Sequence, residues 1–165
     1  MVNEIIRQCD TIKVETMNFN GLQKRAKNTI INEKTGKINK KKRFGKSLAN
    51  KAPSMLLTIL KNKVESKGGL FMEVNTYKIK ASQYNHLNQE YNKKKLSQRW
   101  NYFNYNNEDI KIQRDLYSAF IIKNVEDLET INNKKCTEDF NIFLKRHDKE
   151  IIRLQGLNNL SSMGI

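Results

Sequence analysis

Cysteine, histidine and proline are scarce in this chain of 165 residues, which holds two cysteines, two histidines and one proline. Cys9, Cys136, His86 and His147 are widely separated and form neither a Cys-x-x-Cys pair nor a His-Glu-x-x-His pattern. This spacing argues against a structural zinc site. The two cysteines are expected to be free, reduced thiols of the core type in a cytoplasmic protein.

Long apolar runs are also lacking. The mean hydropathy is −0.75, and no apolar run approaches the length of a membrane-spanning segment. No strongly basic amphipathic helix with an aromatic face stands out, so a membrane surface is a poor partner. The first residues, Met1–Arg7, resemble neither a signal peptide nor a transit peptide. We therefore expect a cytoplasmic chain with one modest core, of a composition that fits a fragment of a larger protein.

Acidic residues are few relative to basic ones, with 17 Asp and Glu against 31 Lys and Arg and a formal net charge of +14. Such an imbalance indicates a polyanionic partner, and nucleic acid is the natural one. Many of the cations fall in a predicted loop, Asn18–Lys46, that suits phosphate contact without base specificity. They are Lys24, Arg25, Lys27, Lys34, Lys37, Lys40, Lys41, Lys42, Arg43 and Lys46.

Apolar periodicity predicts an α/β fold. A helix over Val2–Cys9 is followed by a strand over Thr11–Met17, in which apolar and polar residues alternate. A second helix is predicted with Pro53 in its first turn, an apolar stripe from Ser54 onward, and a stop at a pair of glycines. Leu70–Tyr77 then reads as a strand. This order of elements predicts a sheet with a helical crossover.

Glu15 lies at the C-terminal end of the first predicted strand. Ligands gather at the carboxyl ends of strands in open α/β sheets, so this carboxylate is a candidate site residue. The alternative is an exposed glutamate on an edge strand.

Asp115 stands just ahead of a short apolar helix within Lys111–Ile122. A carboxylate at a helix start is favoured by the helix dipole and is free to face a metal ion. The alternative is a helix-capping aspartate, with Leu116, Ala119 and Phe120 forming the core face.

Between these two acids, Lys78–Asp109 is polar, and aromatic residues alternate with basic ones such as Arg99. These rings either stack on unpaired bases or hold a small insertion together. A polar linker, Glu126–Lys134, leads to a last amphipathic helix that opens at Thr137 and carries His147 as a packed residue. The end of the chain, from Leu157, is expected to fray.

Three segments resemble motifs of the TnpB, or OrfB, proteins of bacterial insertion sequences. Ile12–Lys24 resembles their second RuvC motif, in which a strand ends in a catalytic glutamate. Gln113–Ala119 resembles their third RuvC motif, in which an Asp-Arg-Asp triplet leads into a helix. Lys80–Gln83 resembles the segment before their zinc-ribbon cysteines. The motifs follow the family's order along nearly the whole chain.

The resemblance implies part of an RNA-guided DNA endonuclease with a ribonuclease-H-like, or RuvC, domain. In this family three acidic residues hold two Mg²⁺ (or Mn²⁺) ions. By resemblance, Glu15 and Asp115 are two of these catalytic, metal-binding residues, and Arg114 orients Asp115 or contacts phosphate. DNA and a guide RNA are the implied partners. The residues expected to bind nucleic acid are Lys24, Arg25, Lys40, Lys41, Lys42, Arg43, Lys46, Arg99 and Arg114.

The chain departs from the family at several positions. The first catalytic aspartate of the family precedes the segment that Glu15 matches, so it is missing here. Asn85, Asn88 and the Trp100–Phe103 region stand where the family has zinc ligands, so a degenerate ribbon without zinc is expected. Gln113 replaces the first aspartate of the triplet. Without the missing carboxylate, the chain alone is expected to lack nuclease activity.

The motifs divide the chain into a RuvC-like part with the basic loop (1–79), a ribbon-like insertion (80–110), RuvC-like C-terminal helices (111–155) and a tail (156–165). Two other classes stay open. A non-enzymatic nucleic-acid-binding remnant or regulator would use the charge without the carboxylates. A small basic ribosome-associated protein would explain the charge but not the ordered motifs.

Overall fold

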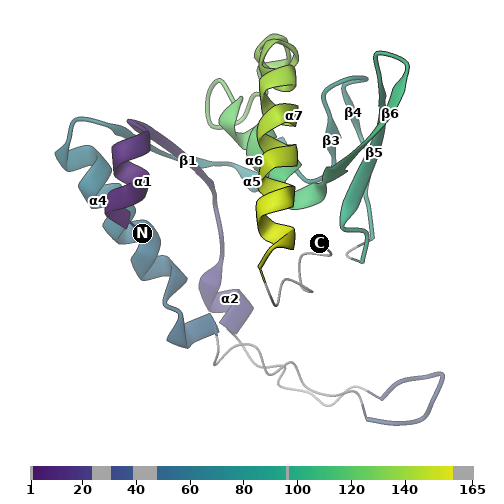
Figure 1. The fold of residues 1–165 in the computed structure, drawn as a ribbon. Helices are drawn as coiled ribbons and strands as arrows, with labels where there is room; N and C mark the ends of the chain where they lie inside the picture. Colours follow the sequence, from purple (N-terminus) through teal and green to yellow (C-terminus); the bar gives the residue numbers. More distant parts are fainter. Residues whose placement is uncertain (1, 24–30, 39–47, 96, 158–165) are drawn as a thin grey trace. The chain divides into compact units, whose positions relative to one another are not determined.

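The computed structural model describes residues 2–23, 31–38, 48–95 and 97–157. Seven of the predicted nucleic-acid-binding residues lie outside these ranges: Lys24, Arg25, Lys40, Lys41, Lys42, Arg43 and Lys46. Most of the predicted fraying tail lies outside them too. The described residues form a mixed α/β structure with six named helices and three two-stranded sheets (Figure 1). The chain divides into two compact units, residues 1–12 with 16–72, and residues 13–15 with 73–165.

The first unit has a small core between two helices, α1 (Val2–Gln8) and α4 (Pro53–Ser66). Its buried residues are Ile6, Leu60 and Val64. Both helices were predicted from their apolar spacing, and Pro53 stands in the first turn of α4 as expected. A short helix, α2 (Phe19–Gln23), lies in the segment predicted to be entirely loop, so that prediction was wrong there.

Two glycines end α4. Gly68 has a φ of 76°, in the left-handed region that glycine adopts without strain. Gly69 is needed for a different reason, because a Cβ atom there would lie 2.4 Å from the backbone oxygen of Asp10. That same oxygen accepts a hydrogen bond of 2.8 Å from the backbone N–H of Leu70.

The two predicted strands are present but shorter than expected. They are β1 (Thr11–Glu15) and β2 (Leu70–Val74), which pair in one sheet. The predicted second strand was too long, because Thr76–Ile79 forms a short helix, α5. The Asn75 side chain caps α5 by accepting hydrogen bonds from the backbone N–H groups of Tyr77 and Lys78.

The second unit contains two antiparallel strand pairs that the sequence did not predict. A short pair joins β3 (Tyr84–Asn85) to β4 (Glu90–Tyr91), and a longer hairpin joins β5 (Trp100–Tyr105) to β6 (Glu108–Gln113). Asn106 and Asn107 form the hairpin loop, with φ values of 53° and 64°. Two-residue loops with positive φ match the twist of a hairpin, and Asn tolerates this conformation.

The core of the second unit lies between the β5–β6 hairpin and the helices α6 (Arg114–Lys123) and α7 (Asn133–Gln155) (Figure 1). α6 buries Tyr117, Phe120 and Ile121, so the predicted core face was partly wrong: Ala119 is exposed. α7 begins four residues earlier than predicted, with the Asn132 side chain as its cap. The members of this core are Val74, Ile79, Ala81, Tyr84, Phe103, Ile112, Tyr117, Phe120, Ile121, Val125, Cys136 and Phe140.

The two cysteines are free, as predicted, but only Cys136 is fully buried. His147 is buried on α7, which confirms its assignment as a packed residue. None of the described helices is both long and apolar enough to cross a membrane.

Candidate functional site

Asp115 lies in the first turn of α6, directly after β6. The helix cap is Gln113, whose side-chain oxygen accepts hydrogen bonds from the backbone N–H groups of Asp115 (2.7 Å) and Leu116 (2.9 Å). The capping role considered for Asp115 is therefore wrong. Its side chain is 51% exposed and stands at the positive end of the helix dipole.

Glu15 lies at the end of β1 and belongs to the second unit together with Lys13. The Lys13 ammonium donates hydrogen bonds to the backbone oxygens of Lys123 (3.2 Å) and Val125, at the C-terminal end of α6. Side chains two apart on a strand point to the same face. Lys13 therefore holds this stretch of β1 against α6 and places Glu15 beside the helix.

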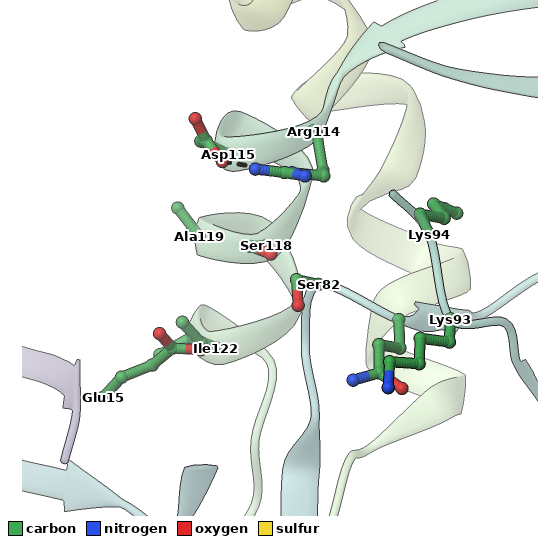
Figure 2. A pocket seen from close by; sticks show the side chains of 10 residues that line it. Glu15, Ser82, Lys93, Lys94, Arg114, Asp115, Ser118, Ala119 and Ile122 are labelled. Atoms are coloured by element: carbon green, nitrogen blue, oxygen red, sulfur yellow. Dashed lines mark hydrogen bonds and ion pairs between the residues drawn. The ribbon is translucent and has the colours of Figure 1, made fainter. Parts of the chain in front are cut away.

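Glu15 and Asp115 line one pocket of about 570 Å³. Ala119 and Ile122 follow Asp115 by four and seven positions, so this pocket extends along two turns of α6. Figure 2 shows Glu15 beside Ile122 and Asp115 at the start of the helix. The other lining residues are Ser82, Gln83, Lys93, Lys94, Arg114 and Ser118.

The two carboxylates have different electrostatic environments. Burial raises the pKa of the Glu15 carboxyl above its ordinary value. Asp115 is paired with Arg114, whose Nε lies 3.4 Å from Oδ1 (Figure 2). The guanidinium is itself fixed, because Nη1 donates to the backbone oxygen of Gln98 at 3.2 Å.

Lys93 and Lys94 were not predicted as site residues, yet both line the pocket. The Lys94 ammonium donates to Oδ1 of the buried Asn101 at 2.6 Å. Burial lowers the pKa of Lys94, and the nearby Arg114 charge lowers it further. The sequence feature that could have indicated them is the run Lys93–Lys95 among aromatic residues. Arg99, which was predicted, is absent from the lining residues.

A divalent ion with oxygen ligands fits the donor set better than zinc does. The described residues include no group of three or more His, Cys, Asp or Glu side chains able to hold a metal ion. Mg²⁺ commonly uses one or two carboxylates and completes its shell with waters and phosphate oxygens. Two carboxylates in one pocket, one of them half-buried, match that requirement in part, although they lie at opposite ends of the stretch of α6 that lines the pocket.

The positions expected to mark a degenerate zinc ribbon form turn hydrogen bonds instead. The Asn85 oxygen accepts from the backbone N–H of Leu87 at 3.0 Å, and the Asn88 amide donates to Glu90 at 2.6 Å. These two amides therefore stabilise the short β3–β4 turn.

Most aromatic residues described within Lys78–Asp109 pack in the protein, which favours the interpretation that they hold this segment together. Tyr84 and Phe103 are buried in the core, and Trp100 and Tyr105 are half-buried. Tyr102, at 69% exposure, is available for stacking on a ligand.

We compared the chain with family models, with curated proteins and with solved structures, and it matches none of them.

Proposed function

We propose that the chain is the C-terminal part of a TnpB-type RNA-guided DNA endonuclease. It would supply part of a RuvC-like domain, with a ribbon-like insertion that carries no zinc. The observation that supports this most is the position of Glu15 and Asp115. They are 100 positions apart in the sequence and come from a strand end and a helix start, yet they line one pocket.

In this proposal Glu15 and Asp115 are two of three acidic ligands, and the third is not assigned to a residue of this sequence. When bound, the Mg²⁺ or Mn²⁺ ions would activate water and stabilise the leaving oxygen of a phosphodiester. Arg114 orients the Asp115 carboxylate. Lys93 and Lys94 place positive charge in the same pocket, where a nucleic-acid phosphate would enter.

A second candidate is a non-enzymatic nucleic-acid-binding protein. The ion pair between Arg114 and Asp115 favours it, because this cation already neutralises one of the two carboxylates. The two proposals differ in one property: a pure binder needs no divalent cation in this pocket.

The test is Mn²⁺ binding by the purified chain, measured by electron paramagnetic resonance. Glu15→Gln and Asp115→Asn should each weaken binding at least tenfold, because each removes a charged oxygen ligand. Matched controls are Glu73→Gln, at an exposed position of β2, and Glu138→Gln, at an exposed position in the second turn of α7. Equal affinity in all five proteins would favour the binder and contradict the nuclease proposal.

A further inference from the structure

Gln113 is a fully buried polar residue at the corner between β6 and α6, next to Asp115. Its side-chain oxygen caps α6, as described above, and its side-chain nitrogen donates to Oδ2 of Asp115 at 3.4 Å. Arg114 meets the other carboxylate oxygen at 3.4 Å. The orientation of the Asp115 carboxylate is therefore set by two neighbouring donors, one of which is buried.

His147 fixes the backbone at this corner from a distant element. Its Nε2 accepts a hydrogen bond of 3.0 Å from the backbone N–H of Gln113, and both residues are buried. That bond leaves the ring hydrogen on Nδ1, which donates to the Asp148 carboxylate at 2.8 Å. Trp100 and Phe143 pack against the imidazole, with ring centroids 6.4 and 5.9 Å away.

These contacts form a continuous series from α7 to the pocket. Asp148 sets the tautomer of His147, His147 holds the Gln113 backbone, and the Gln113 side chain holds both the first turn of α6 and the Asp115 carboxylate. Groups that orient a ligand in this way commonly change metal affinity 10- to 100-fold when they are removed.

We propose that His147 and Gln113 are positioning residues for Asp115, which hold its carboxylate in the orientation that binds a divalent cation. This inference rests on the proposed function, because it assumes that Asp115 is a metal ligand. The competing explanation is that both residues only stabilise the core.

Two variants separate positioning from stability. His147→Phe keeps an aromatic ring between Trp100 and Phe143 but removes the acceptor for the Gln113 N–H. The matched control is His86→Phe, which makes the same substitution at a histidine of the same core. His86 bonds to Tyr117, at 2.7 Å between Nδ1 and the hydroxyl oxygen, and neither residue lines the pocket.

The experiment measures the Kd for Mn²⁺ and the urea unfolding midpoint of each protein. His147→Phe and Gln113→Leu should raise the Kd about tenfold, whereas His86→Phe should lower the midpoint and leave the Kd within about twofold. His147→Gln should restore part of the affinity, because its side-chain oxygen reaches the position of Nε2.

Three other results would contradict the inference, and one of them would also contradict the proposed function. If Glu15→Gln and Asp115→Asn abolish binding while His147→Phe and Gln113→Leu bind normally, the positioning role is wrong and the proposed function stands. If His86→Phe loses as much affinity as His147→Phe, core stability accounts for the effect and the positioning role is again wrong. If the native chain binds no Mn²⁺, or the carboxylate variants bind like the native chain, the proposed function fails and the inference with it.

Discussion

At the scale of single residues, His86 is a buried titratable group that lies against Phe120 and Phe140. Burial lowers the pKa of His86 from 6.5 to about 4. The imidazole is therefore neutral in the folded chain at pH 7, with Nδ1 bonded to the Tyr117 hydroxyl.

This shift predicts a loss of stability in acid. As the pH falls below 6.5, the unfolded chain takes up a proton at His86 before the folded chain does, so the free energy of unfolding decreases between pH 6.5 and pH 4. Between pH 7 and pH 5 the loss from this group should be about 2 kcal/mol. Urea unfolding of the native chain and of His86→Phe at both pH values measures it. Parallel losses in the two proteins would contradict the assignment.

The residues of the candidate site were predictable to different degrees. Glu15 and Asp115 were predictable because they stand at the end of a predicted strand and the start of a predicted helix, within two segments that resemble family motifs. Gln113 was missed as a cap because Ser, Thr, Asp and Asn are the residues that usually cap helices. Its role depends on the backbone N–H bond to His147, 34 positions away, which no local pattern reveals.

At the scale of the elements, α4 was predictable because its apolar stripe, its proline and its two glycines all point to the same boundaries. The β5–β6 hairpin could not be predicted in this way. In β5 the buried positions are Asn101 and Phe103, whereas Tyr102 faces solvent. A polar residue inside and an aromatic residue outside reverse the usual alternation, and Asn101 is tolerated because the Lys94 ammonium bonds to its side-chain oxygen.

The turn between α4 and β2 gives a prediction for the first unit. Gly69→Ala should lower the free energy of unfolding by about 1–3 kcal/mol, because the new methyl group would overlap the Asp10 backbone oxygen and the Val64 side chain. Urea unfolding followed by circular dichroism measures this loss.

Gly156→Ala is the matched control for that turn. Gly156 ends α7 with a φ of −75°, and a Cβ atom there would lie no closer than 3.5 Å to the Arg153 backbone oxygen. This variant should be neutral or slightly stabilised. If Gly69→Ala is as stable as the native chain, the close approach of residue 69 to the Asp10 backbone oxygen does not exist in solution.

At the scale of the whole molecule, the net charge of +14 predicts binding to nucleic acid that depends steeply on salt. Lys and Arg side chains that neutralise phosphates release counterions, so affinity for a DNA duplex should fall at least 100-fold, as an order of magnitude, between 50 and 200 mM salt. Fluorescence anisotropy with two duplexes of unrelated sequence measures this. The two should bind alike, because phosphate contacts carry no sequence information. Affinity that is insensitive to salt would contradict the prediction.

The central claim is that the pocket lined by Glu15 and Asp115 binds divalent cations. Paramagnetic broadening by Mn²⁺ in the amide NMR spectrum tests it most directly, because broadening falls off with distance from the ion. The account predicts that signals from Glu15 and from the first two turns of α6 broaden first, and that the Glu15→Gln, Asp115→Asn double variant loses this effect. Broadening that is uniform, or that persists in the double variant, would contradict it.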